Sequence, residues 1–164
     1  MRLRIKRVAI VFTLLSHSLM AQQDDKLEIL NTIHQVFEAM RTSDSTLLKE
    51  AFTESPNTFT VFKNKEGVTQ FRSDDFQNFI NAVGEPKEDV WNEPIWNEKV
   101  EIDGSLASVW VDYAFYFNNT FSHCGVDAFH LVKLEGKWKI FHLVDTRRKS
   151  DCEIPANVES RFTD

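Results

Sequence analysis

At 164 residues, with 42% hydrophobic and 12% aromatic side chains, the chain has the length and composition of one globular domain with a substantial core, which excludes a disordered protein. Its formal net charge is −6. Proteins that bind nucleic acid usually carry a strongly basic surface, so this charge balance argues against a nucleic-acid partner.

The N-terminal segment has the order of a secretory signal peptide. Four basic residues between positions 2 and 7 precede an apolar run over residues 8–20, and Ala21 is followed by a polar stretch. We therefore predict a signal peptide over residues 1–21, a single mature domain with a short C-terminal tail over residues 22–164, and a secreted or periplasmic protein with no membrane partner after cleavage. Cleavage would leave 15 Lys and Arg against 25 Asp and Glu, a net charge of −10. The alternative is a buried N-terminal helix.

Hydrophobic periodicity indicates helices in the first half of the mature chain and strands in the second. Asp24 or Asp25 is the predicted N-cap of the first helix, and Ser73 that of the third. In chain order the predicted elements are helix 24–40, helix 46–52, strands 58–63 and 68–72, helix 74–83, an extended segment 89–103 interrupted by Pro94, and strands 106–117, 121–134 and 137–148. This order predicts an α+β fold in which the helices cover one face of a mainly antiparallel sheet.

Two short turns determine which side chains of the last three strands share a face. Asn118-Asn119 and Glu135-Gly136 have the composition of two-residue hairpin turns, because Asn and Gly tolerate positive φ. The resulting register would place Asp112 opposite Gly125, which leaves room above the sheet. One face would then combine aromatic residues with a few polar groups, the composition of a ligand pocket: Trp110, Asp112, Tyr116, His123, Asp127, Phe129, His142, Thr146 and Arg148.

Within this predicted pocket, Asp112 and His123 would be diagonal neighbours on adjacent strands. A carboxylate beside the imidazole would raise its basicity, so the pair is a candidate general base for proton abstraction or elimination. The alternative is a structural pair that ties the two strands together.

The other polar groups of this face are candidates for ligand contacts. Thr146 and Arg148 could hold a ligand oxygen, and Asp127 could accept a hydrogen bond from a ligand or from the Trp110 indole. His123 and Asp127 would lie about 13 Å apart along one strand at roughly 3.3 Å per residue, too far to bind one metal ion. We therefore predict neither a metal nor a cofactor.

The opposite face of the same strands is apolar and would meet water as one large patch, which normally marks an interface. We predict a homodimer through this face, formed by Val109, Val111, Phe115, Val126, Val132, Phe141 and Leu143.

Cys124 and Cys152 are the two cysteines of the chain. In an exported protein they could form a disulfide, or they could be two independent thiols.

Three stretches carry a family resemblance: Glu101–Val111 (EIDGSLASVWV), Ser122–Phe129 (SHCGVDAF) and Gly136–Ile140 (GKWKI). Together with helices that precede a curved sheet, they resemble the nuclear transport factor 2-like superfamily over residues 26–148, and within it the exported bacterial branch labelled lumazine-binding, near the SnoaL-like cyclases. The resemblance implies a cone in which N-terminal helices pack on a strongly curved, mainly antiparallel sheet and enclose a cavity, commonly with dimerisation through the sheet. It implies no single reaction, because the superfamily includes isomerases, dehydratases and proteins without chemistry.

These inferences predict an exported domain that binds a small, partly apolar molecule, with acid–base chemistry of the isomerase, lyase or cyclase type at Asp112 and His123. The alternative is a noncatalytic dimeric interaction domain whose cavity is filled by its own core. An open cavity of several hundred Å³ would favour the first hypothesis. Trp110 and Phe129 packed into that space would favour the second.

Overall fold

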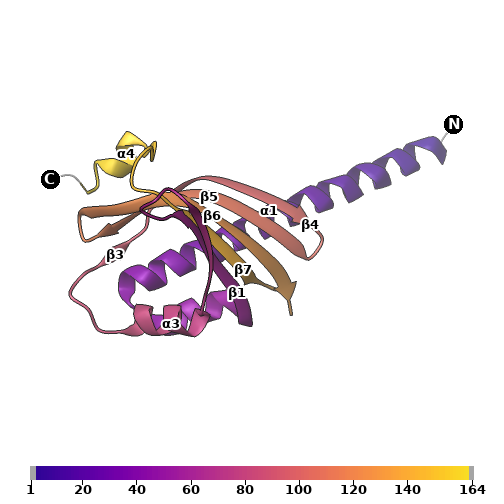
Figure 1. Cartoon of the computed structure of the whole chain (residues 1–164). Helices are drawn as coiled ribbons and strands as arrows, with labels where there is room; N and C mark the ends of the chain where they lie inside the picture. Colours follow the sequence, from indigo (N-terminus) through magenta and orange to yellow (C-terminus); the bar gives the residue numbers. More distant parts are fainter. Residues whose placement is uncertain (1–2, 163–164) are drawn as a thin grey trace.

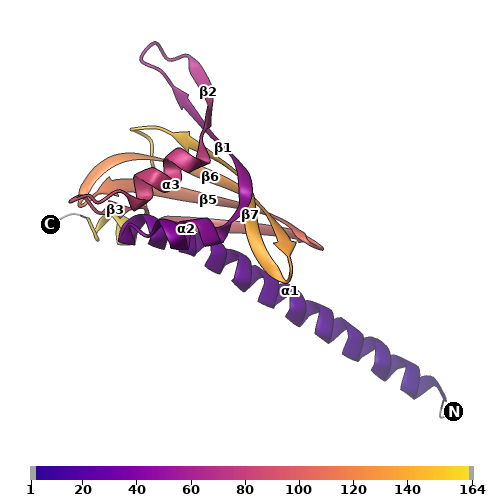
Figure 2. The same cartoon turned by 90° about the horizontal axis from the view of Figure 1, so that it is seen from below.

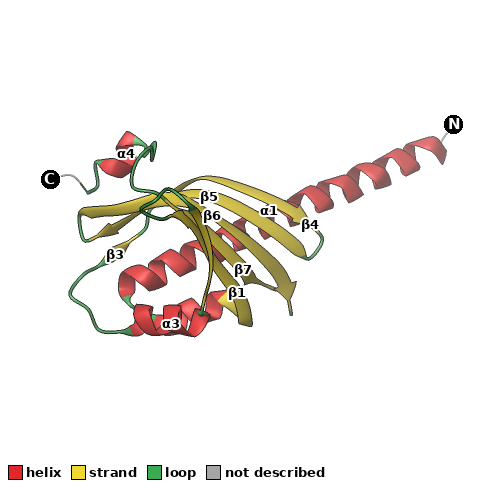
Figure 3. Cartoon of the chain, viewed as in Figure 1, coloured by secondary structure: helices red, strands yellow, loops and turns green. Residues whose placement is uncertain are grey.

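The computed structural model of the protein describes residues 3–162, with side chains from residue 22 onwards. A strongly curved sheet arches over a layer of helices, which confirms the predicted α+β cone (Figures 1 and 3). The elements are α1 (Leu3–Thr42), α2 (Ser45–Ala51), β1 (Phe52–Lys63), β2 (Thr69–Asp74), α3 (Phe76–Gly84), β3 (Trp91–Asn92), β4 (Ile95–Asp103), β5 (Leu106–Phe117), β6 (Thr120–Leu134), β7 (Lys137–Arg147) and α4 (Ala156–Glu159). Helices α1, α2 and α3 lie on the concave side of the sheet, as the view from below shows (Figure 2).

The sheet has the order β2-β1-β7-β6-β5-β3, and β4 also pairs with β5. All of these pairings are antiparallel except that of β1 with β7, in which Phe59 lies beside Val144 in parallel register. The predicted interruption at Pro94 is confirmed, because β3 ends at Asn92 and β4 begins at Ile95. The Pro94 carbonyl still accepts a hydrogen bond from the Ala114 N–H at 3.2 Å, so the interrupted segment stays beside β5.

Asp side chains cap the two shorter helices of the concave side. The Asp44 carboxylate accepts from the first turn of α2, and Asp75 accepts from the Gln77 N–H of α3 at 2.8 Å. The prediction of Ser73 as the cap of α3 is wrong, because Ser73 still belongs to β2 and pairs with Phe59.

Helix α1 covers the sheet with one apolar stripe. Its buried residues contact the apolar side chains of β5, β6 and β7 and form the core: Ile29, Ile33, Val36, Phe37, Ala39 and Met40. The predicted N-cap at Asp24 or Asp25 is wrong, because α1 begins upstream at Leu3. The Asp25 carboxylate instead accepts from Trp138 Nε1 at 3.0 Å and from Lys133 Nζ, which ties α1 to the β6–β7 hairpin. These hydrogen bonds lower the pKa of Asp25.

The first half of α1 extends beyond the sheet (Figure 1). It contains most of the predicted signal peptide; residues 1–2 of that prediction lie outside the described residues. Over residues 3–162, no helix combines the length and the apolar composition that crossing a bilayer requires.

Both hairpin turns contain the two predicted residues, but each is followed by a β-bulge that shifts the register. The first bulge is at Ser122 in β6, beyond which Phe115 pairs with His123. The second is at Phe141 in β7. A bulge adds one residue to one strand, and a shift of one residue reverses which side chains share a face.

The reversal corrects the predicted faces of β5. Asp112 pairs with Val126 rather than Gly125, and Trp110 is 49% exposed on the outer, convex side of the sheet. The residues predicted for the dimer interface divide between the two sides. Val109, Val111 and Phe115 belong to the core, and Leu143 packs against it, whereas Val126 and Val132 alternate with the inward-facing Asp127 and Leu131 and so face outward.

Gly125 lies where β7 and a tyrosine approach β6 most closely. A Cβ atom placed there would lie 1.7 Å from the Thr146 carbonyl oxygen and 2.8 Å from Cε1 of Tyr113. The space that the absent side chain leaves is thus filled by protein and is no part of a pocket.

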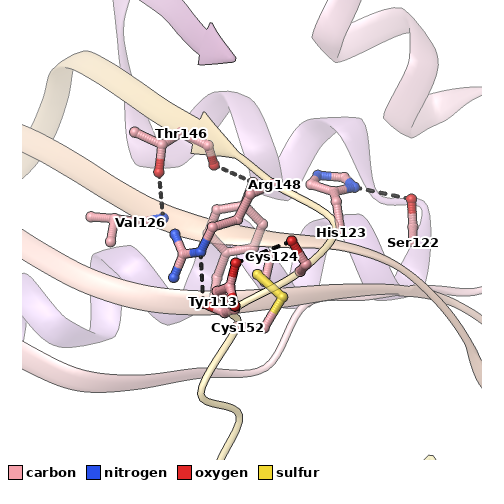
Figure 4. The surroundings of a disulfide bond; sticks show 10 residues. Tyr113, Ser122, His123, Cys124, Val126, Thr146, Arg148 and Cys152 are labelled. Carbon is pink, nitrogen blue, oxygen red and sulfur yellow. Dashed lines mark hydrogen bonds between the residues drawn. A yellow bond between two sulfur atoms is a disulfide. The ribbon is translucent and has the colours of Figure 1, made fainter. Parts of the chain in front are cut away.

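Of the two alternatives for Cys124 and Cys152, the structure has the disulfide, with a Cα–Cα distance of 5.8 Å (Figure 4). It attaches the C-terminal tail to β6. The tail ends in α4, which lies on the convex side of the sheet (Figure 1), and Phe162 stacks on Tyr116 with ring centroids 4.1 Å apart.

Candidate functional site

A cavity of about 1290 Å³ lies between the helices and the concave face of the sheet. Aromatic residues from α1, α3, β3, β5 and β6 form an apolar part of its wall: Phe37, Phe79, Trp91, Phe115 and Phe129. A space of this size with apolar walls suits a small organic ligand, provided that polar groups orient it.

Two carboxyl groups form the polar centre of the cavity. Asp127 projects inward from β6 and is only 4% exposed, and Glu93 comes from the interruption between β3 and β4, next to Pro94. The two side chains lie close enough for each to shift the pKa of the other. Two neighbouring carboxyl groups out of water cannot both be ionised without strong repulsion, so their proximity favours a proton on at least one of them.

The surroundings raise the pKa of both carboxyl groups. Burial, and then the negative charge of Asp145, raise the pKa of Glu93 to about 8. Burial, and then Glu93, raise the pKa of Asp127 well above its ordinary value. The pair can therefore donate a hydrogen bond or a proton at a pH where an exposed carboxyl group could not.

Tyr113, Asp145 and Arg147 form a second polar group on the cavity wall. The Tyr113 hydroxyl donates to the Thr146 carbonyl at 2.9 Å and lies 3.4 Å from Asp145 Oδ2. Arg147 Nε donates to the same Asp145 oxygen at 2.5 Å. Burial, and then the nearby carboxyl groups, raise the pKa of Tyr113, so its hydroxyl stays protonated.

His123 lies on the cavity wall as a neutral imidazole. Its Nδ1 is 3.0 Å from Ser122 Oγ, the bulge residue (Figure 4). Burial, and then the positive charge of Arg147, lower the pKa of His123 to about 4. The ring can exchange hydrogen bonds with a ligand, but it is a weak base at neutral pH.

The structure brings only part of the predicted site together. The cavity is lined by His123, Asp127, Phe129, Thr146 and Arg148. Thr146 contributes mainly backbone, since its hydroxyl accepts from the Val126 N–H at 3.0 Å and its carbonyl from Tyr113.

Four predicted site residues lie elsewhere, because the bulges reversed their faces. Asp112 lies on the convex side near Trp110, where it accepts from Asn97 Nδ2 at 2.7 Å, so the predicted Asp112–His123 pair does not form. Tyr116 is buried beneath the C-terminal tail. The Nδ1 atom of His142 is 3.0 Å from that of His130.

A family model described as "Putative lumazine-binding" matches residues 24–144. This chain belongs to that family. The match spans the second half of α1, helices α2 and α3, and nearly all of the sheet, including Glu93, Asp127 and the two bulges. No curated protein sequence matches this lumazine-binding family member with statistical significance.

Solved structures share the fold at low sequence identity. An NTF2-like protein of unknown function from Shewanella baltica OS155 is 18% identical, with 77% of this chain and 96% of that chain covered and a TM-score of 0.60. A protein of unknown function from Mycobacterium tuberculosis is 15% identical, with 85% and 82% covered and a TM-score of 0.64. A protein titled "Putative Scytalone Dehydratase" from Novosphingobium aromaticivorans is 12% identical, with 82% and 92% covered and a TM-score of 0.60.

Four residues of the site were not predicted from the sequence: Glu93, Tyr113, Asp145 and Arg147. The bulges moved Tyr113, Asp145 and Arg147 from the predicted opposite face into the cavity. Glu93 could have been found from the sequence, because it is an acidic residue next to Pro94, which interrupts a strand.

In the described part of the chain, no set of three His, Cys, Asp or Glu side chains is arranged to hold a metal ion.

We expect the stability of this lumazine-binding family member to fall as the pH rises from about 6.5 to about 8, above the range in which the lowered pKa of His123 acts in the opposite direction. The pKa of Glu93 is raised from 4.5 to about 8, so between these values the folded chain keeps a proton that the unfolded chain has released. Each such proton lowers the free energy of unfolding by at most about 1.4 kcal/mol per pH unit. Chemical denaturation across this range measures the slope, and Glu93→Gln should flatten it. The exposed Glu98→Gln is the control, and an equal slope in Glu93→Gln and the wild type would contradict the assignment.

Proposed function

We propose that this chain binds a small, partly apolar molecule in the cavity and transfers a proton to or from it through the Glu93–Asp127 pair. The observation that carries the proposal is the placement of two neighbouring carboxyl groups, Glu93 and the buried Asp127, on the wall of one cavity. A proton-transfer group works best when its pKa lies near the working pH, because it then both holds and releases the proton. The reaction class is isomerisation, elimination or cyclisation by proton transfer.

His123, the base expected from the sequence, suits this role less well than the carboxyl pair. Its pKa of about 4 leaves it unprotonated but weakly basic at neutral pH. We assign it, with the Tyr113 hydroxyl, to hydrogen bonding with polar atoms of the ligand. The elimination chemistry of the proposal is also the activity named in the titles of two fold neighbours, from Streptomyces avermitilis and Novosphingobium aromaticivorans.

The size of the cavity supports ligand binding over the noncatalytic alternative. A filled core would need Trp110 and Phe129 inside the cone. Phe129 forms part of the wall, but Trp110 is 49% exposed on the convex side, and about 1290 Å³ remains open. The volume exceeds what a small organic ligand needs.

Deuterium exchange tests the proposal without knowledge of the substrate. The protein is incubated in D₂O with a small-molecule extract of its source cells, and mass spectrometry identifies molecules that gain deuterium at carbon. We expect exchange with the wild type and a loss of at least about 100-fold in Asp127→Asn. Asp112→Asn, on the convex side, is the matched control. A molecule that binds in the cavity but exchanges no carbon-bound proton in the wild type would support a noncatalytic binding protein instead.

We also propose that the protein is exported after removal of residues 1–21. The basic start and the apolar run support this. N-terminal sequencing of the exported protein should begin near Gln22, and retention of Met1 would contradict the proposal.

We also propose a homodimer. Its interface would be the convex side of β5 and β6 rather than the face predicted from the sequence. Its support is the exposed Trp110 together with the outward-facing, half-buried Val126 and Val132. Sedimentation should show a dimer that Trp110→Glu dissociates, and a monomeric wild type at high concentration would contradict it.

A further inference from the structure

Positive charge gathers at one end of the cavity although the chain is acidic overall, with a net charge of −6. Five basic residues line the cavity, and all come from β1, β2, the end of β7 or the two residues that follow it: Lys63, Arg72, Arg147, Arg148 and Lys149. The register explains why they converge. Phe62 lies beside Arg147 in the parallel β1–β7 pair, and Lys63 pairs with Thr69 of β2. The ends of β1 and β7 therefore lie beside the start of β2.

Four of these residues form what we call the cationic mouth: Lys63, Arg147, Arg148 and Lys149. All four are exposed while lining the cavity, so they lie at its solvent end. The fifth, Arg72, is already engaged, because its Nε donates to Asp74 Oδ1 at 2.9 Å and its guanidinium lies over the Phe62 ring.

The donors of the cationic mouth are mostly uncommitted. Arg147 and Arg148 each use Nε, to Asp145 at 2.5 Å and to the Asp151 carbonyl at 3.1 Å. Within residues 22–162 their terminal guanidinium nitrogens make no further hydrogen bond, and the Lys63 and Lys149 ammonium groups make none. Guanidinium ends of this kind bind the oxygens of a carboxylate, sulfonate or phosphate in bidentate geometry.

Two of the four acidic residues at this end of the cavity are already paired with arginines. Asp74 pairs with Arg72, Asp75 caps α3, and Asp145 binds Arg147. The Asp151 carboxylate accepts from Ser150 Oγ at 3.2 Å. Lys63, Arg148 and Lys149 therefore outnumber Asp75 and Asp151, the two carboxylates here that have no cationic partner.

We infer that the ligand of this cavity carries an anionic oxygen group, which the cationic mouth binds while the apolar body of the ligand enters the aromatic cavity. The inference rests on the proposed function, since it names the class of molecule that the proposed site accepts. It also assigns an orientation, with the anionic group at the solvent end and the part of the ligand that reacts at the Glu93–Asp127 pair.

Two fluorescent probes that share a ring system test this inference. 8-Anilinonaphthalene-1-sulfonate carries a sulfonate, and N-phenyl-1-naphthylamine is its uncharged counterpart. We expect the sulfonate to bind the full mature chain about tenfold more tightly at low salt, a preference that corresponds to about 1.4 kcal/mol. The preference should shrink as added salt screens the charges. Energy transfer from Trp91 to the bound probe, reduced in Trp91→Phe, places the probe in the cavity.

Charge reversal then assigns the preference to the cationic mouth. Lys63→Glu combined with Lys149→Glu should abolish the preference for the sulfonate while leaving the affinity for the uncharged probe unchanged. Lys137→Glu, an exposed lysine at the opposite end of β7, is the control and should leave the preference intact. The inference would be overturned if the wild type bound the two probes with equal affinity, or if Lys137→Glu lost the preference for the sulfonate as fully as the double variant. Either result would leave the proposed function standing. If neither probe enters the cavity, the proposed function itself is contradicted.

Discussion

Replacing Gly125 by alanine should destabilise the protein by at least about 3 kcal/mol or prevent folding altogether. The added Cβ would lie 1.7 Å from the Thr146 oxygen and 2.7 Å from its carbonyl carbon, and both are backbone atoms that cannot rotate away. To relieve the clash, β7 would have to separate from β6. That movement would break the hydrogen bond from the Val126 N–H to Thr146 Oγ1 and the paired bonds between Cys124 and Arg148. Chemical denaturation monitored by circular dichroism measures the loss.

Gly104→Ala separates the effect of the clash from the general effect of replacing a glycine. Nothing lies within 4 Å of a Cβ at Gly104, but its φ of +57° is unfavourable for alanine. That strain should cost about 1–2 kcal/mol. A loss in Gly125→Ala no larger than the loss in Gly104→Ala would mean that β6 and β7 do not approach each other as closely as described.

Cys152→Ser should lower the free energy of unfolding by about 3.5 kcal/mol under oxidising conditions. The disulfide closes a loop between residues 28 positions apart, and removing it frees that loop in the unfolded chain. The variant should also bind the sulfonate probe more weakly, because Arg148 and Lys149 lie in the segment that the disulfide attaches to β6.

A reducing agent provides the matched control for this prediction. It should lower the stability of the wild type to that of Cys152→Ser and leave the variant unchanged. If the variant is as stable as the oxidised wild type, the disulfide contributes nothing to the folded state. A drop in stability with unchanged probe affinity would show that the segment after β7 keeps its position without the bond.

The sequence predicted the architecture well, because the architecture depends on repeated signals. The buried stripe of α1, the Asn118-Asn119 and Glu135-Gly136 turns and the alternation along β5 to β7 each involve many residues that indicate the same element. The three stretches that resemble the nuclear transport factor 2-like superfamily indicated the same fold. An error of a few residues at the boundary of any element therefore left the predicted fold class unchanged.

The site was harder to predict because it depends on single residues. One extra residue at Ser122 and another at Phe141 decide which side chains face the cavity, and neither residue type marks a bulge in a strand of mixed aromatic and polar composition. Asp127 was placed correctly in the pocket, but Asp112 was assigned to the wrong side. Glu93 depends on the path of the chain around Pro94, which local pattern alone does not specify.

The parallel pairing of β1 with β7 has a consequence for when the cationic mouth forms during folding. Phe59 and Val144 come from opposite ends of the domain, and contacts between such distant residues form late, since the intervening chain must first be brought together. The cationic mouth needs both strands, with Lys63 on one and Arg147 at the end of the other. A chain emerging from a ribosome or a translocation channel can therefore fold its helices and its β5–β6 hairpin early, but it gains the cationic mouth only when its last strand arrives. Refolding experiments should find the recovery of ligand binding in the slowest phase, after most of the secondary structure has formed.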